Sequence, residues 1–154
     1  MIKGYKVVVN DLRPMKGKNI RFEIGKWYTE EGDLVLRKKG FHFCKNITDL
    51  ADYCMVYSPN TRIFEVEADG KMIDDKGQTV AEKIRLVREI NKEEWDTKEM
   101  RMVAVQSNGL NLRFFPDADS EIQLAAIRNR KKAINFVKNP SREVQEEIDK
   151  MLRE

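Results

Sequence analysis

The sequence predicts an α+β fold: a small twisted antiparallel or mixed sheet with one or two helices, followed by a short α-helical repeat tail. Two observations predict it. Residues 1 to about 90 are rich in β-branched and aromatic residues and are interrupted by Gly and Asp, which is typical of short strands and turns. From about residue 91 the apolar residues recur with helical spacing. We therefore expect an α+β domain at residues 1–92 and a helical-repeat tail at residues 93–154, packed on the first domain.

Several segments of the first part have the character of strands. In one of them Ile20, Phe22 and Ile24 alternate with polar residues, which puts the apolar side chains on one face of a sheet. A loop is expected from Gly70 to Gly77, between two alternating segments. The expected strands are residues 5–9, 20–24, 34–36, 62–68 and 83–90.

One helix is expected between these strands. Asn46 is a suitable N-cap, and Asp49 follows in the first turn, where the helix dipole favours an acid. Because only this clear helix interrupts the strands, the sheet is expected to be antiparallel or mixed. The apolar stripe of the helix consists of Ile47, Leu50, Ala51, Cys54 and Met55.

The C-terminal part contains an internal repeat. Residues 99–105 align with residues 121–127, which lie 22 positions later. A third, truncated copy begins at Glu143, after a further 22 positions. Ser120 and Gln123 have the form of a capping box, and Asn139-Pro140 has the form of a helix start. Each copy is expected to be a helix, a turn and a second short helix that bury their apolar faces against neighbours. Such packing across a two-fold axis makes a homodimer the expected oligomer.

Composition and charge exclude several classes of protein. The chain has 154 residues, with 29 basic and 26 acidic side chains, and none of its apolar runs has the length that crosses a bilayer. Its beginning lacks the apolar core of a signal peptide, so a cytoplasmic location is expected. Nucleic-acid binding is not expected at a net charge of +3. The one basic cluster, interpreted as a solvated helix face, is Arg128, Arg130, Lys131 and Lys132.

Two cysteines and one histidine cannot complete a four-ligand zinc site without carboxylates, and no metal is expected. No cofactor is expected either. Cys44 and Cys54 are expected to be reduced thiols.

A series of short motifs gives the first part a family resemblance. The motifs are Tyr5-Lys6, residues 22–28 (FEIGKWY), residues 40–44 (GFHFC), Asp52-Tyr53 and residues 65–68 (EVEA). In this order they resemble an uncharacterised domain of phage and prophage proteins, over roughly residues 4–92. The tail is similar to short helical repeats of phage proteins at the sequence NPSREVQ of residues 139–145. The two resemblances imply a phage or prophage protein that acts in the cytoplasm of an infected bacterium.

A second, weaker resemblance is to the ADP-ribosyltransferase fold. The order of a strand, a Gly40-Phe41 segment, a helix and a strand with Glu65-x-Glu67 looks like that of these NAD-cleaving enzymes. The resemblance implies Glu65 or Glu67 as the catalytic acid. The chain lacks the Ser-Thr-Ser element of that family.

His42 is the only histidine, and it lies between a turn and the expected helix N-terminus. Helix N-termini attract phosphates, and a histidine there can hydrogen-bond a ligand or transfer protons. The alternative is a half-buried histidine bonded to a backbone group.

Glu65 and Glu67 share a strand face, and paired carboxylates can perform acid–base work or bind ribose hydroxyls. Their alternative is a solvated sheet face. Arginine and lysine side chains are candidate anion partners, and aromatic rings can stack on a base or fill the core. The residues expected to contact a ligand are Tyr5, Arg21, Lys26, His42, Phe43, Arg62 and Glu67; in an enzyme, Glu65, Glu67 and His42 would carry the chemistry.

The sequence contains no P-loop, dinucleotide fingerprint, nucleophile elbow or zinc-protease motif. The function expected from these observations is that of a phage-encoded, non-enzymatic binding protein. Its ligand would be a small anionic, nucleotide-like molecule, with an immune signal of the bacterial host, which it would sequester, as the candidate. Two alternatives stay open: an ADP-ribosyltransferase-like or NAD-cleaving enzyme, and a protein–protein inhibitor of a host defence factor that docks through the repeat tail.

Overall fold

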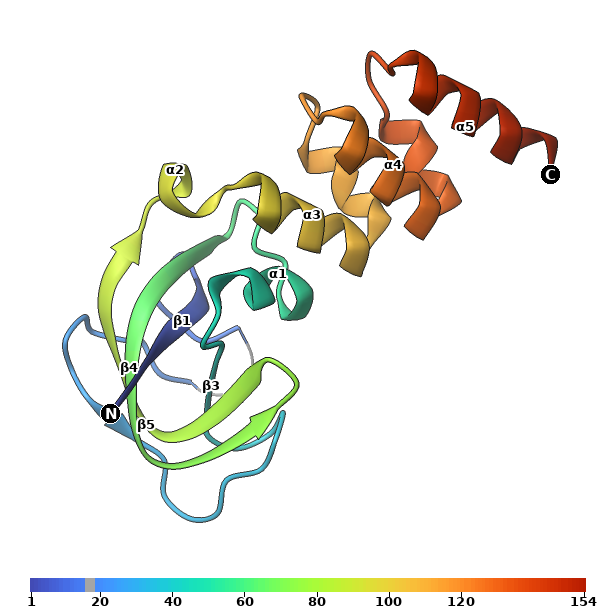
Figure 1. Ribbon diagram of the computed structural model, residues 1–154. Coiled ribbons are helices and arrows are strands. Elements are labelled where there is room, and N and C mark those ends of the chain that lie inside the picture. Colours follow the sequence, from blue (N-terminus) through green and yellow to red (C-terminus); the bar gives the residue numbers. More distant parts are fainter. Residues whose placement is uncertain (16–18) are drawn as a thin grey trace. The chain divides into compact units, whose positions relative to one another are not determined.

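The computed structural model describes residues 1–15 and 19–154. The chain forms two compact units, Met1–Asp96 and Thr97–Glu154 (Figure 1). The first unit contains an antiparallel five-stranded sheet, and the second consists of helices and turns, so the predicted α+β class is confirmed. The expected boundary after residue 92 lies inside the first unit.

The sheet is built on one long hairpin. Its strands are β1 (Ile2–Val9), β2 (Tyr28–Thr29), β3 (Phe41–Phe43), β4 (Thr61–Asp75) and β5 (Gln78–Ile90), in the order β1-β4-β5-β2, with β3 also paired to β5. Strands β4 and β5 form the curved hairpin seen in Figure 1. The pairing shifts register after Glu65 and after Asp69, and such bulges bend the strands.

The curved sheet closes on itself next to β3. Tyr5 and Cys44 exchange two backbone hydrogen bonds, of 2.8 and 2.9 Å, so β1 is joined to β4 on one side and to the end of β3 on the other. The apolar core lies inside this small barrel. It consists of Val8, Phe22, Phe41, Phe43, Phe64, Val66, Ala68, Ala81, Ile84 and Leu86.

The alternation of residues 62–68 determines which side chains enter the barrel. Phe64, Val66 and Ala68 are completely or almost completely buried in it. Glu65 and Glu67 alternate with them on the outer face. The strand is longer than predicted, because residues from Gly70 to Asp75 also belong to it. The loop expected from Gly70 to Gly77 is therefore wrong, and the turn consists of Lys76 and Gly77, both at positive φ.

The expected helix after Asn46 is present but short. It consists of the 3₁₀ turn η1 (Ile47–Asp49) and α1 (Leu50–Tyr53), and the Asn46 side chain accepts a hydrogen bond from the Thr48 amide. The predicted apolar stripe of this helix is wrong at its C-terminal end, at Cys54 and Met55. The backbone becomes extended at Cys54, and Met55 is 54% exposed.

Two predicted strands, residues 20–24 and 34–36, are wrong. Phe22 is buried, but Ile24 is 54% exposed, and Gly25 at φ 87° turns the chain. The Tyr28 hydroxyl accepts from the Glu23 amide and Phe22 packs edge-on against the Tyr28 ring, so this segment is a loop folded around its own side chains. Residues 34–36 contribute only an isolated bridge, which closes a tight turn.

The short helix α2 (Lys92–Trp95) ends the first unit, and five elements make up the second. These are α3 (Lys98–Ser107), η2 (Gly109–Phe114), α4 (Ser120–Asn129), η3 (Lys131–Phe136) and α5 (Arg142–Arg153), where η marks a 3₁₀ helix. Their beginnings recur at the interval of the sequence repeat. None of the helices within residues 1–15 and 19–154 has the length and apolar character needed to cross a bilayer.

The helix caps of the second unit recur at the same interval. Thr97, Asp119 and Ser141 each accept a hydrogen bond from the backbone N–H three positions later. Two predicted caps are therefore wrong by one or two positions. Ser120 is the first helical residue after the cap Asp119, and Pro140 precedes the cap Ser141 rather than following one.

Equivalent positions of the repeats are buried. The first set is Met100, Ile122 and Val144, and the second is Ala104, Ala126 and Ile148. Gly109 shows how closely the elements approach, because a Cβ atom there would lie 2.2 Å from the Ala126 carbonyl oxygen. This position excludes any larger residue.

Candidate functional site

A shallow hollow of about 210 Å³ lies on the outer face of the sheet. Alternation and register bring its residues together, since Tyr5 is paired with Glu65 and Lys3 with Glu67. The hollow is lined by Lys3, Gly4, Tyr5, Lys45, Glu65, Val66, Glu67 and Val87.

Both carboxylates of the hollow are engaged by arginines of β5. The Glu67 carboxylate accepts from Arg85 Nε at 2.8 Å and lies 2.6 Å from its Nη2, and its side chain is only 14% exposed. The Glu65 carboxylate accepts from Arg88 Nε at 3.0 Å. Neither carboxylate is free to act on a substrate without first losing a charged partner, which does not favour acid–base chemistry here.

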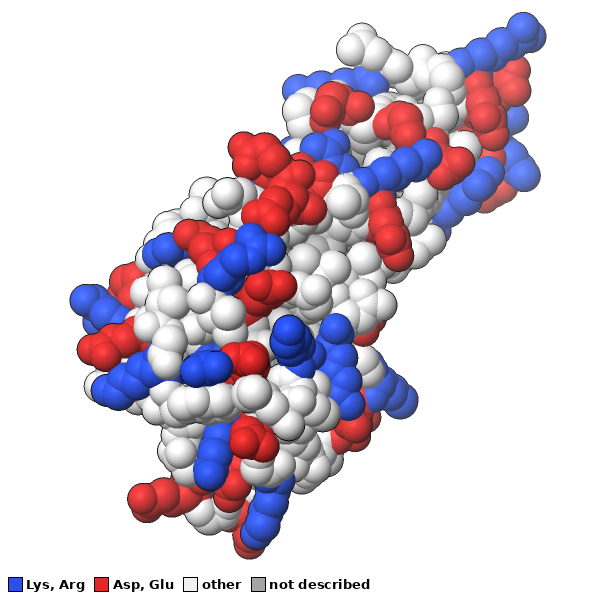
Figure 2. Space-filling model, turned by 60° about the vertical axis from the view of Figure 1, so that its left-hand side comes forward, with Lys and Arg blue, Asp and Glu red and all other residues white. Residues whose placement is uncertain are grey.

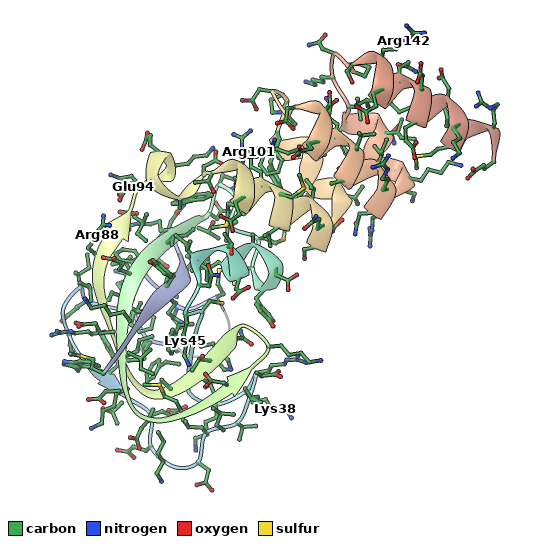
Figure 3. All side chains as sticks on the ribbon, in the orientation of Figure 1. Lys38, Lys45, Arg88, Glu94, Arg101 and Arg142 are labelled. Atoms are coloured by element: carbon green, nitrogen blue, oxygen red, sulfur yellow. The ribbon has the colours of Figure 1, made fainter. Side chains whose placement is uncertain are left out.

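The two arginines are themselves held in place. The Arg85 guanidinium lies 5.0 Å from the centre of the Trp27 ring, in a cation–π contact. Arg88 also donates to Glu94 at 3.1 Å, and the two side chains point toward one another in Figure 3. Hydrogen bonds to Glu94 raise the pKa of Arg88 further above its ordinary value. The two carboxylates of the hollow therefore belong to an ionic network with Arg85, Arg88 and Glu94.

The two lysines of the hollow have fewer ionic contacts than its carboxylates. Lys3 is exposed and forms no ion pair with any residue in the described part of the chain. The Lys45 ammonium lies 3.1 Å from a carboxylate oxygen of Asp74, and both side chains are well exposed. Together with the half-buried Tyr5 ring and the exposed Val87, they offer two ammonium groups beside an aromatic and aliphatic surface.

His42 does not line this hollow. Its Nε2 accepts a hydrogen bond of 2.8 Å from the Arg37 amide, and its backbone carbonyl accepts one of 2.6 Å from the buried Lys6 ammonium. The imidazole is thus bonded to a backbone group, which is the alternative that the sequence left open. The helix N-terminus that follows is capped by Asn46.

Arg62 lies at a second hollow, of about 370 Å³, between the ends of β4 and β5 and residues 56–59. Its guanidinium donates to both carboxylate oxygens of Glu89, at 2.7 and 2.9 Å, and to the Asn10 carbonyl at 3.0 Å. The hydrogen bonds from Arg62 lower the pKa of Glu89. The arrangement fastens the loop after β1 to the hairpin.

The remaining predicted ligand contacts lie apart from the first hollow. Lys26 lies 3.9 Å from Glu23, and its ammonium lies over the Tyr28 ring. Arg21 lies 3.7 Å from Asp11, in the preceding loop. Phe43 is 2% exposed and packs in the barrel core.

Of the residues predicted for a site, the structure brings together Tyr5, Glu65 and Glu67. Sequence reasoning missed Lys3, Lys45 and Val87. Lys3 has a signal in the sequence, because it lies two positions before Tyr5 and so on the same strand face. The other two depend on pairings between distant segments.

Among the described residues, neither cysteine chemistry at Cys44 nor metal binding is favoured by the structure. Burial raises the pKa of the Cys44 thiol to about 12, so this sulfur stays protonated and unreactive at neutral pH. Within residues 1–15 and 19–154 the structure contains no group of three side chains that would hold a metal ion.

A family model described as a domain of unknown function, DUF7666, matches residues 2–98. The chain belongs to this family. The match covers the whole of the sheet and agrees with the uncharacterised domain expected over roughly the same residues. Neither the curated proteins nor the solved structures contain a significant match to the chain.

Proposed function

We propose that the protein is a non-enzymatic binding protein whose DUF7666 domain takes a small anionic, nucleotide-like ligand in the hollow beside Tyr5. One observation supports this most: Tyr5 lines the hollow together with two lysines, Lys3 and Lys45, while Glu65 and Glu67 of the same hollow are paired with arginines. An aromatic ring binds a base by stacking, and ammonium groups bind phosphate as point charges.

The size of the hollow limits how much of a ligand enters it. At about 210 Å³ it is smaller than the ~300 Å³ at which pockets for drug-sized ligands begin. We infer that a base or a sugar phosphate enters, while the rest of the ligand stays in solvent. Such partial burial suits a protein that sequesters a ligand better than one that excludes water from a reaction.

The biological part of the proposal rests on the resemblance to phage and prophage domains. A phage protein that binds a nucleotide without altering it would act by lowering its free concentration. We therefore propose a counter-defence role in the cytoplasm of an infected bacterium, with a nucleotide-derived signal of host immunity as the ligand and a homodimer as the working form. This arrangement needs no ligand contact from His42.

Thermal-shift measurements with mononucleotides, cyclic nucleotides and linear oligonucleotides test the proposal. A ligand that binds only the folded state stabilises it by ~2.7 kcal/mol at one hundred times its Kd. Tyr5→Ala and Lys3→Glu should each abolish the shift. Lys71→Glu, a charge reversal on an exposed lysine outside the lining, should leave it unchanged. Absence of any shift across the panel, or an equal loss in the Lys71 variant, would contradict the proposal.

One observation keeps an enzymatic alternative in the test. Glu67 is the more buried of the two carboxylates of the hollow, at the position that the ADP-ribosyltransferase resemblance gives to a catalytic acid. NAD should therefore be incubated with the protein and a bacterial lysate. Intact NAD supports a binding protein; release of nicotinamide that disappears in the Glu67→Gln variant would establish the enzyme instead.

A further inference from the structure

The second unit carries a cluster of cations that its own fold does not require. The cluster consists of Arg128, Arg130, Lys131 and Lys132, at the end of α4 and the beginning of η3. All four side chains are exposed. We call these residues the basic turn.

Internal ion pairs do not account for the basic turn. Arg128 lies 3.6 Å from Glu147, and as a residue of the last turn of α4 it also interacts favourably with the helix dipole. Arg130, Lys131 and Lys132 form no ion pair with any residue that the structure describes. Three neighbouring cations thus repel one another without internal compensation.

The repeat provides a comparison for these positions. In the first copy the equivalent residues are Gln106, Asn108, Gly109 and Leu110, and none is charged. The same helix–turn–helix forms there without cations. The basic turn is therefore not part of what makes a repeat fold.

Helix capping also indicates that the fold does not require the basic turn. Asn108 is the N-cap of η2, and its side chain accepts a 3.0 Å hydrogen bond from the Leu110 amide. Arg130 is the N-cap of η3 and provides no such bond, because a guanidinium has no acceptor. Lys131 and Lys132 then occupy the first turn of η3, the end where the dipole favours acids. Each of the α-helices of this unit has a glutamate in its first turn: Glu99, Glu121 and Glu143.

We infer that the basic turn is a docking site for an acidic segment of a partner protein. Charge complementarity selects the partner, because three unpaired cations in consecutive positions match a short run of carboxylates. A nucleic acid fits less well, since appreciable affinity needs many phosphate contacts along a basic stripe. Figure 2 shows basic and acidic side chains interspersed over the face in view rather than such a stripe.

The test uses the full chain and a fluorescein-labelled peptide of eight glutamates as the probe, with fluorescence anisotropy as the readout. The variant Arg130→Glu/Lys131→Glu/Lys132→Glu should weaken binding by about tenfold or more, since it turns attraction into repulsion. The matched control Lys138→Glu/Lys150→Glu/Arg153→Glu makes the same change of charge at exposed positions elsewhere in the unit. It should change the affinity by less than about twofold.

Three results would overturn the inference: no binding of the glutamate peptide at low salt, an equal loss of affinity in the control variant, or tighter binding of a duplex DNA through the same residues. A glutamine peptide of the same length should not bind. Because the probe does not involve Tyr5 or Lys3, failure here leaves the proposed nucleotide site untouched. Circular dichroism of each variant establishes that the helices are retained.

Discussion

The two units are stabilised by contacts of opposite range in the sequence. In the first unit β1 pairs with residues that follow it by more than fifty positions, and β3 joins the ends of the sheet. In the second unit each helix packs on elements of its own or the next repeat. The comparison teaches that the first unit depends on a single cooperative core, whereas the second depends on a sum of neighbouring interfaces.

The largest effect is expected from a cavity in the barrel. Phe64→Ala removes a completely buried ring and should destabilise the first unit by ~3–5 kcal/mol. Trp27 and Trp95 both lie in this unit, so their fluorescence reports its unfolding, while far-UV circular dichroism reports mainly the helices of the second unit. Denaturant titration followed by both probes should show the fluorescence midpoint falling well below that of the wild type.

The matched control for this cavity is Leu112→Ala in the second unit, which should lower the helical midpoint by the equivalent of ~2–5 kcal/mol and leave the fluorescence midpoint in place. Coincident transitions for both probes in the wild type and in both variants would break the comparison, because the units would then unfold as one.

A smaller effect is expected from a repeat cap. Asp119 caps α4 by accepting a 3.0 Å hydrogen bond from the Ile122 amide. Asp119→Ala should cost ~1 kcal/mol of the stability of the second unit, and Asp119→Ser should restore most of it, as Ser141 does for α5. Thermal unfolding followed by circular dichroism measures the difference; equal losses for alanine and serine would show that the cap does not act through its side-chain acceptor.

Acid should weaken both units through different residues. The backbone bond from Ile122, together with Lys98, lowers the pKa of Asp119 below 3.8, and the bonds from Arg62 lower the pKa of Glu89 below 4.5. A lowered pKa gives stability that is present above the unfolded value and is lost as the pH falls through the folded value. Stability should therefore decline below about pH 4.5 in the first unit and about pH 3.8 in the second.

Variants separate the two contributions to this decline. Glu89→Gln should flatten the acid response of the fluorescence transition, and Asp119→Ser that of the helical transition. The effects are expected to be small because both side chains are substantially exposed. Urea midpoints between neutral pH and about pH 3 measure them, and an unchanged slope in both variants would assign the acid response to other groups.

The smallest effect is expected to be a gain. Arg130→Asn gives η3 the cap that Asn108 gives η2, and it should stabilise the second unit by about 0.5 kcal/mol. The same variant removes one cation of the basic turn, so the affinity for the glutamate peptide should fall as the thermal midpoint rises. A thermal midpoint that falls instead would contradict the argument that Arg130 is a poor N-cap and that the fold does not require it.

The same difference in range explains what the sequence predicts. The repeats are visible because equivalent positions such as Met100 and Ile122 are buried in the same way and carry similar side chains. The caps are misplaced by one or two positions because residues of equal capping ability lie close together in the sequence: Asp119 is next to Ser120, and Asn139 is two positions before Ser141. Local chemistry predicts the helix but not which of several nearby capping residues begins it.

In the first unit, alternation predicts the first half of β4 correctly but fails at Ile20, Phe22 and Ile24. Only Phe22 is buried there, under a loop whose path depends on Tyr28 and on Gly25. Some residues of the candidate site could likewise be predicted from local alternation, and others could not. Tyr5 and Glu67 follow from alternation along single strands, whereas the approach of Lys45 depends on the closure between β1 and the end of β3.

That closure also has a consequence for synthesis of the chain. Strand β1 leaves the ribosome first, but its partner β4 begins only at Thr61 and the barrel is complete only after Ile90. Until then the valines of β1 have no sheet to join, and an unpaired apolar strand is prone to aggregate. The helices after Asp96, by contrast, can form one after another as they emerge, so the risk of aggregation during synthesis lies in the first unit, before β5 has emerged.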